Sequence, residues 1–284
     1  MHGKSIELFL VNGTADSIVT AELSNWNGKA IKIPRIEVAD CKREDIQDPG
    51  VYFLFCRDED KDEDSVYIGE AENVKERLVQ HLHDANAEKE KYYWNTAVIF
   101  TGRDLNKALI RYLENELVDI AKKSHRYEVL TKNTYKNTVL KESQIAAMEE
   151  FLDNIKILIN ALGYKVLELL HQINPTDGNR TDNLLYLKTN TVDATGAVTT
   201  EGFVLLAGAK INENVPGKSL SKGMLKLRNK HFDAGHVSEN LITTEDILFS
   251  SSSTAADFVT GYSVSGPACW KDKDGKSLKE MESE

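Results

Sequence analysis

Apolar and polar positions alternate in short runs over the first hundred residues, and these runs predict β-strands. Residues 5–11 and 18–23 alternate on either side of an Asn-Gly turn dipeptide, a pattern typical of a hairpin. The run VYFLF at 51–55 and the run SVYIG at 65–69 are predicted to be two strands joined by an acidic, solvated loop. WNTAVIF at 94–100 is predicted to be a third strand.

Apolar positions three or four residues apart predict the helices that accompany these strands. Asn73 and Glu76 have the spacing of a capping box at the start of the first helix. A longer amphipathic helix is predicted from residue 104 to about 123, with leucines along one side. Another is predicted over 143–170, interrupted or ended near Gly163. The expected order is therefore strand, strand, helix, strand, helix, and then a further helix.

A polar, turn-forming stretch at 174–183 (NPTDGNRTDN) separates this region from a second domain. Beyond it the pattern changes to short alternating segments, with a helix near 219–231 and a helix after a serine run at 250–261. We therefore expect an α+β protein in four parts. These are an N-terminal β extension at 1–48, a central domain at 49–140, connecting helices at 141–173 and a smaller α+β domain at 184–284.

Composition narrows the class of protein. The 284 residues are 41% hydrophobic and 28% charged, close to the usage of soluble globular chains. The three cysteines (Cys41, Cys56 and Cys269) lie far apart, so neither a disulfide framework nor a thiolate zinc site is indicated. The N-terminus lacks a long apolar region, and no later stretch approaches ~18 uninterrupted apolar residues. We therefore expect a cytoplasmic protein with no membrane partner.

The net charge of −10 argues mildly against a nucleic-acid partner, because contacts to phosphates are made by Lys and Arg. Distant charges are screened beyond about 8 Å at physiological salt, so binding of nucleic acid depends on the charge of the local surface patch. One such patch has no acidic residue between 214 and 232. It is interpreted either as a solvated helix face or as a phosphate-binding surface. Its basic residues are Lys218, Lys222, Lys226, Arg228 and Lys230.

Some residues of the second domain are interpreted as structural. Trp270 could stack on a base, but a single tryptophan in such a pattern belongs more often to the core. His231 and His236 lack a third ligand at the spacing of a metal site. We therefore expect the second domain to contribute binding rather than chemistry.

Two tyrosines in the paired strands and two polar residues on the first helix form the candidate catalytic group. Tyr52 (in GVY) and Tyr67 (in YIG) can share one face of the sheet. Arg77 and His81 are four residues apart and lie on one side of the helix. Each residue alone has an ordinary structural explanation, as a half-buried ring or a surface charge, but the combination indicates a site.

These motifs, in this order, resemble the GIY-YIG nuclease superfamily. GVY matches the first motif, YIG the second, Arg77 the helix arginine, and LENELV at 113–118 the pattern that carries the glutamate, here Glu114. The segments TEGFVL and GYSVSGPACW further resemble a bacterial subgroup with a C-terminal domain of unknown function. The resemblance implies a small domain with a three-stranded antiparallel sheet flanked by helices.

The resemblance also implies hydrolysis of phosphodiester bonds in nucleic acid, DNA rather than RNA, with one divalent metal ion, Mg²⁺ or Mn²⁺. Glu114 would hold the metal through a hard carboxylate oxygen, and Arg77 would bind phosphate oxygens. Tyr52 would act as the general base, although a phenol with a pKa of about 10 is a poor base unless neighbouring groups lower that pKa. His81 would assist it, and Tyr67 would orient the water or hold a phosphate.

Two assignments within the site have competitors. At about 100° per residue, Glu114 and Glu116 lie equally far from the centre of the helix's apolar stripe, so only the resemblance favours Glu114. Asn133 follows at a plausible place for the family's late asparagine, and Asn137 competes with it.

Glu70 and Glu72 directly follow YIG, where many relatives have basic or small polar residues beside the substrate phosphates. These acids disfavour tight binding of DNA. The alternative function, from a different class, is a GIY-YIG protein that has lost catalysis and acts as a nucleic-acid-binding module. RNA as a substrate, the target preference and the oligomeric state stay open.

Overall fold

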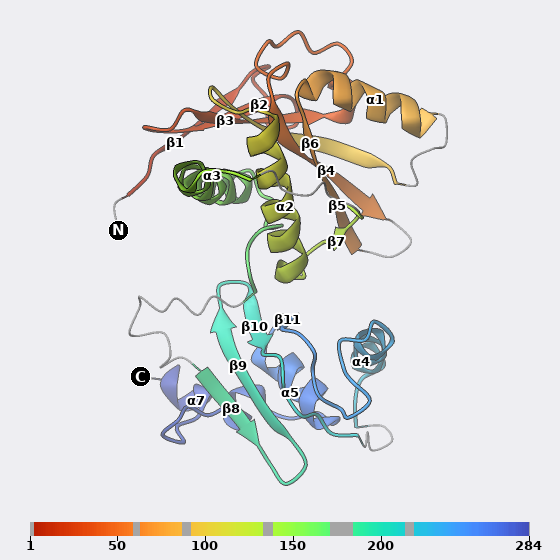
Figure 1. The fold of residues 1–284 in the computed structure, drawn as a ribbon. Coiled ribbons are helices and arrows are strands. Elements are labelled where there is room, and N and C mark those ends of the chain that lie inside the picture. The colour runs from red at the N-terminus through yellow and green to blue at the C-terminus, as the bar shows by residue number, and fades with distance from the viewer. Residues whose placement is uncertain are drawn as a thin grey trace. The chain divides into compact units, whose positions relative to one another are not determined.

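The computed structural model of the protein describes residues 3–58, 63–86, 92–132, 139–170, 184–213 and 219–283. The chain divides into two compact units, Met1–Leu169 and Leu170–Glu284, whose elements are drawn in Figure 1. Both units combine strands and helices, so the predicted α+β class is confirmed. Within the described ranges, no helix has both the length and the apolar character needed to cross a membrane.

A seven-stranded sheet in the order β1-β2-β3-β6-β4-β5-β7 forms the framework of the first unit. Neighbouring strands are antiparallel except β5 and β7, which are parallel. The predicted hairpin is present as β1 and β2, and β3 pairs with β6, so the N-terminal strands extend the same sheet as the tyrosine motifs. The strands are β1 (Ile6–Leu10), β2 (Val19–Leu23), β3 (Gly28–Pro34), β4 (Gly50–Asp58), β5 (Glu63–Ala71), β6 (Trp94–Gly102) and β7 (Glu128–Val129).

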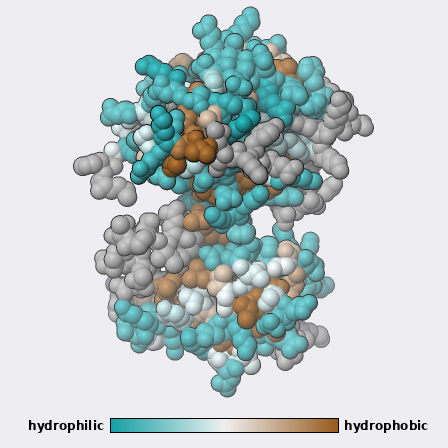
Figure 2. Space-filling view, in the orientation of Figure 1, coloured by the Kyte–Doolittle hydropathy of each residue, from teal (hydrophilic) through white to brown (hydrophobic). Residues whose placement is uncertain are grey.

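Side chains of β4 alternate between two apolar clusters, one on each face of the sheet. Val51 and Phe53 pack with α2 and α3, whereas Tyr52 and Leu54 pack on the face that α1 covers. On the face of the protein drawn in Figure 2, most of the surface is hydrophilic and the hydrophobic patches are smaller. The helices of this unit are η1 (Arg35–Glu37), α1 (Val74–Asn86), α2 (Lys107–Ser124) and α3 (Glu142–Ala161).

The beginnings of α1 and α2 are set by asparagine caps. The Glu76 backbone N–H donates to Asn73 Oδ1 at 3.1 Å, as the capping-box spacing predicts. Helix α2 begins later than the sequence pattern predicts. The reason is that Asn106 Oδ1 accepts the backbone N–H groups of Ala108 and Leu109, at 3.0 and 3.3 Å, and so caps the helix.

Helix α3 belongs to the core of the first unit. Its residues Phe151 and Leu158 lie in the same apolar cluster as β4 and α2. The helix ends at Ala161, and Gly163 follows with φ +95, a left-handed conformation that favours glycine. The segment at 141–173, expected to hold connecting helices, therefore contributes a packed helix to this unit.

The second unit is built on a four-stranded antiparallel sheet in the order β11-β10-β9-β8. Trp270 is fully buried against Phe203 and donates its indole N–H to the Ser252 backbone oxygen at 2.9 Å, so its interpretation as a core residue is confirmed. The helix expected after the serine run is present and is capped by Ser251. The elements are β8 (Leu184–Lys188), β9 (Asp193–Thr199), β10 (Gly202–Leu205), α4 (Lys222–Asp233), β11 (Ile247–Phe249), α5 (Ser252–Thr260), α6 (Gly266–Cys269) and α7 (Leu278–Met281).

Gly50, the first residue of β4, permits the close approach of β4 to β6. A Cβ atom at this position would lie 2.4 Å from the backbone oxygen of Phe100. That oxygen belongs to the strand that pairs with β4, so it cannot move without disturbing the pairing. The glycine of GVY is therefore explained by the packing of the sheet.

We predict that Gly50→Ala lowers the free energy of unfolding of the first unit by about 1–3 kcal/mol, the usual cost of overpacking a well-packed position. Differential scanning calorimetry measures the effect as a lower melting temperature. Gly3→Ala is the control, because a Cβ at Gly3 meets no atom within 4 Å. Equal melting temperatures for the two variants would contradict the prediction.

Candidate active site

Tyr52 lies on β4 directly opposite Gly69 of β5, and it is only 1% exposed. A Cβ atom at Gly69 would lie 2.5 Å from the phenol oxygen of Tyr52. The glycine of YIG therefore leaves the space that the Tyr52 ring occupies. The ring centres of Tyr52 and Tyr67 are 6.2 Å apart, so the two tyrosine motifs meet across one strand pair.

Helix α1 brings His81 and Arg77 to the Tyr52 hydroxyl. His81 Nε2 lies 2.9 Å from that hydroxyl, and Arg77 Nε donates to it at 3.4 Å. Arg77 also donates from Nη1 to Gln80 Oε1 at 2.6 Å. The i,i+4 spacing on one helix therefore brings the imidazole and the guanidinium to the same phenol.

The Tyr52 phenol is protonated at neutral pH. Burial raises the pKa of Tyr52 well above its ordinary value of 10, Tyr67 acts in the same direction, and the nearby Arg77 offsets only part of the shift. The protein's own residues therefore do not supply the lowered pKa that would make Tyr52 a good base by itself. A neutral phenol can instead donate its hydrogen to His81.

Glu114 lies on α2, is 5% exposed, and has one carboxylate oxygen, Oε2, with no hydrogen-bond partner. Burial, together with the neighbouring Glu70 carboxylate, raises the pKa of Glu114 to about 7, against the opposing effects of Lys107, Arg111 and Arg77. Glu116, which periodicity ranked equally, is half-buried and does not line the cavity described next.

Most of the residues predicted for the site line one cavity of about 680 Å³. Tyr52, Tyr67, Arg77 and Glu114 line it, whereas His81 is 2% exposed and contacts the two lining tyrosines, with Nε2 beside the Tyr52 hydroxyl and its ring against that of Tyr67. Asn133 and its competitor Asn137 lie outside the described residues. The other lining residues are Glu70, Ala71, Glu72, Asn73, Glu76, Gln80 and Lys107.

The cavity opens where β5 reaches the edge of the sheet. β7 pairs with β5 only at Ser65 and Val66, and the Thr131 hydroxyl then bonds both backbone groups of Ile68. Beyond that point, from Gly69 to Ala71, the described residues place no strand beside β5 on this side. Side chains from both faces of the sheet therefore reach one cavity.

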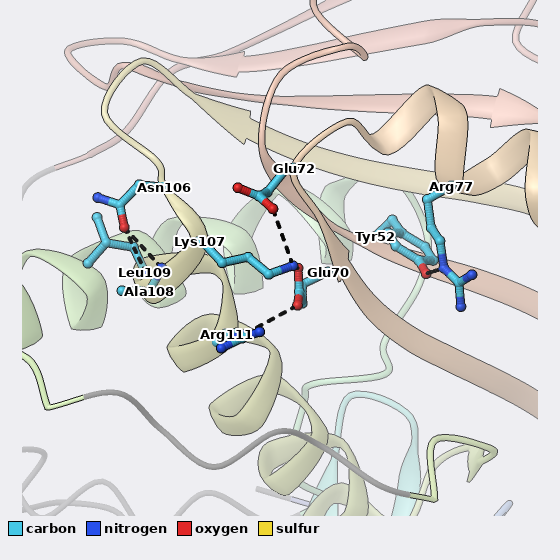
Figure 3. A network of polar contacts seen from close by, with 9 residues as sticks. All are labelled: Tyr52, Glu70, Glu72, Arg77, Asn106, Lys107, Ala108, Leu109 and Arg111. Atoms are coloured by element: carbon cyan, nitrogen blue, oxygen red, sulfur yellow. Dashed lines mark hydrogen bonds and ion pairs between the residues drawn. The ribbon is translucent and has the colours of Figure 1, made fainter.

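Lys107 and Arg111 are residues of the site that the sequence analysis did not single out. Figure 3 shows both cations of α2 directed at Glu70, with Lys107 Nζ 2.8 Å from Glu70 Oε2 and Arg111 Nε 3.7 Å from Glu70 Oε1. Lys107, Arg111 and Glu114 follow the spacing i, i+4, i+7, which places them on one helix face. That spacing is the signal that could have identified them.

Glu114 is the side chain best suited to hold a metal ion. Its unpartnered oxygen is a hard donor of the type that Mg²⁺ and Mn²⁺ prefer, so the residue fits such an ion. Among the described residues, no group of three or more His, Cys, Asp or Glu side chains is arranged to hold a metal. A bound ion would therefore take most of its ligands from water and substrate.

The basic patch of the second unit is only partly available to a partner. Lys222, Lys226 and Lys230 are exposed on α4, whereas Lys218 lies outside the described residues. The assignment of Arg228 to nucleic-acid binding is wrong: it is 3% exposed and its guanidinium donates to the backbone oxygens of Phe258 and Asn212. A buried guanidinium satisfied by carbonyl groups holds the fold together and does not reach a phosphate.

His231 and His236 face each other in the second unit, with their Nδ1 atoms 2.9 Å apart. His236 Nε2 lies 3.1 Å from Glu245 Oε1. Burial, together with the nearby His236 and Lys230, lowers the pKa of His231 to about 4, so His231 is neutral at physiological pH.

Comparison with protein families agrees with this arrangement. Residues 48–136 match the GIY-YIG catalytic domain, and residues 185–282 match a domain of unknown function, DUF4357. No curated protein and no solved structure matches the chain. The first unit therefore carries a domain of a nuclease-type family. The protein is a GIY-YIG protein with a C-terminal DUF4357 domain.

We predict that Glu114→Gln changes the pH dependence of stability. The carboxyl has a pKa of about 7 in the folded chain against 4.5 ordinarily, so the folded state binds more protons between these values. Stability therefore falls as pH rises through this window, and the neutral amide removes that loss. Without divalent ions, the melting temperature of Glu114→Gln should exceed that of the unmodified protein at pH 8 and approach it near pH 5.

Glu116→Gln is the matched control for this measurement, because Glu116 lies on the same helix outside the cavity. Parallel curves of melting temperature against pH for Glu114→Gln and the unmodified protein would show that Glu114 does not titrate in this window.

Proposed function

We propose that the first unit is a metal-dependent nuclease that hydrolyses phosphodiester bonds in nucleic acid. The observation that carries the proposal is the unpartnered, buried carboxylate oxygen of Glu114 in the same cavity as Arg77 and the two tyrosines. A buried carboxylate without a partner is costly, and a cation removes that cost. The same cavity supplies a guanidinium for phosphate and a phenol for proton transfer.

Mg²⁺ or Mn²⁺ is the cofactor we propose, held by Glu114. Four carboxylates and two cationic side chains line the cavity, so the cavity is acidic before a metal binds. A divalent cation balances that charge and, when bound, stabilises the negative charge that develops on the phosphate in the transition state. This explains how an acidic cavity can accept a polyanion.

The protein's own residues handle the phosphate and the proton. Arg77 has five N–H donors, more than its contacts with Tyr52, Tyr67 and Gln80 use, and the remaining donors serve phosphate oxygens. The attacking water gives its proton to the Tyr52 oxygen while Tyr52 passes its own proton to His81 Nε2, 2.9 Å away. This relay needs no free tyrosinate, so the raised pKa of Tyr52 does not prevent it. Tyr67 lies beside Tyr52 and orients the water.

The test is incubation of the purified protein with plasmid, single-stranded DNA, branched DNA and RNA, with Mg²⁺ or Mn²⁺ against EDTA. We expect metal-dependent cleavage, with DNA the favoured substrate. Glu114→Gln should reduce the cleavage rate on the order of a hundredfold or more, comparable to the loss of one transition-state stabiliser. Tyr52→Phe should lower the rate while leaving binding of nucleic acid intact.

Glu116→Gln is the control, and it should cleave like the unmodified protein. If Glu116→Gln abolishes cleavage and Glu114→Gln retains it, the metal-binding residue has been assigned to the wrong position. If the protein binds nucleic acid but no metal supports cleavage, the alternative of a binding module without catalysis is correct.

We further propose that the DUF4357 domain binds the phosphate backbone through Lys222, Lys226 and Lys230. Replacing all three by Gln should weaken affinity uniformly across sequences and flatten the slope of log K against log salt by up to ~0.9 for each lost contact. Replacing the exposed Lys188, Lys210 and Lys279 of the same unit removes the same charge elsewhere and serves as the control. If only the control substitutions change the slope of log K against log salt, this assignment is overturned.

A further inference from the structure

Glu70 follows the YIG motif near the end of β5, and its side chain is almost completely buried, at 3% exposed. Val66 and Ile68, two positions apart on the same strand, pack in the apolar cluster that contains α2. Alternation along the strand therefore directs Glu70 to α2. It meets Lys107 and Arg111 there rather than projecting freely into the cavity.

The two cations differ in their position relative to the cavity. Lys107 lines it and its side chain is 37% exposed, whereas Arg111 is not among the lining residues. The contact of Glu70 with Lys107, at 2.8 Å, is a charge-assisted hydrogen bond. The contact with Arg111, at 3.7 Å, is an ion pair too long for a hydrogen bond.

We propose that Lys107 binds a phosphate group of the nucleic acid, and that Glu70 occupies Lys107 until the nucleic acid arrives. Glu70 then acts as an internal competitor of the substrate and remains paired with Arg111 once Lys107 is released. The inference rests on the proposed function of the same cavity. It assigns a phosphate-binding subsite to α2 and explains an acidic residue directly after YIG.

Replacing Glu70 by a phosphate as the partner of Lys107 is favourable because Glu70 has two cationic partners. Breaking a buried ion pair is costly when it leaves one charge without a partner. Here, Arg111 continues to neutralise Glu70, so the released carboxylate stays paired. A phosphate oxygen offers Lys107 an anionic acceptor of the same kind as the one it loses. Lys107 also lies on the helix face of Glu114, so the bound phosphate would lie beside the metal-binding residue.

The test compares binding of a labelled DNA duplex to the full chain in EDTA, where no cleavage interferes, over a range of salt concentrations. Glu70→Gln should bind on the order of fivefold more tightly at low salt, a factor typical of one charge pair that is not fully buried. Its slope of log K against log salt should become steeper by up to ~0.9. Adding Lys107→Met to Glu70→Gln should abolish the gain.

Glu76→Gln is the matched control, because Glu76 lines the same cavity but is bonded to Asn73 rather than to a cation. It changes the net charge equally. If Glu76→Gln gives the same gain, or Lys107→Met does not cancel the gain of Glu70→Gln, the effect is non-specific and the proposal is overturned. Weaker binding by Glu70→Gln would also overturn it, because Glu70 would then position Lys107 instead of competing for it.

Circular dichroism and melting temperature check that each variant folds. Should Glu70→Gln fail to fold, Glu70→Asp replaces it, since the shorter side chain keeps the charge but withdraws the carboxylate from Lys107. Tighter binding of the duplex by Glu70→Asp supports the proposal, and unchanged binding overturns it. If neither the unmodified protein nor any variant binds or cleaves nucleic acid, the proposed function fails. If they bind but Glu70→Gln behaves as Glu76→Gln does, only this inference fails.

Discussion

The close approach of β4 and β5 at Tyr52 and Gly69 sets the geometry of the whole site. Because the glycine has no Cβ, the Tyr52 ring can lie against β5, and from there its hydroxyl meets His81 and Arg77 on α1. Any side chain at Gly69 would displace the ring from both partners. The two tyrosine motifs are therefore one packing unit, in which a glycine of the second motif makes room for the tyrosine of the first.

Burial then decides the protonation of the groups that the strands bring together. The same desolvation raises the pKa of the Tyr52 phenol and of the Glu114 carboxyl, so both are more easily protonated here than in water. For Tyr52 this favours a hydrogen bond donated to His81. For Glu114 it produces a carboxylate whose charge is poorly compensated at physiological pH, which a metal cation would compensate. One physical cause thus gives two residues complementary roles.

The sequence predicted the parts of this arrangement that depend on local spacing. The hairpin, the cap at Asn73 and the helical pair Arg77 and His81 need only neighbouring residues, and the structure has them. Helical periodicity could not separate Glu114 from Glu116, because that choice depends on which flank of α2 meets the cavity. Arg228 was misjudged for a similar reason: an acid-free segment does not reveal that one of its cations is buried against backbone carbonyls.

The pairing of Glu70 with Lys107 and Arg111 also lay beyond sequence reasoning, since it joins a strand end to a helix 37 residues further along the chain. The alternation of β5 explains why both halves of the site depend on this strand. Tyr67 faces the α1 side, where Tyr52 and His81 lie, and Glu70 faces the α2 side, where Lys107 and Arg111 lie. These faces would be separated in the middle of a sheet. They share a cavity because β5 reaches the sheet edge near Gly69, so the short reach of β7 is what would allow one phosphate to contact both sides.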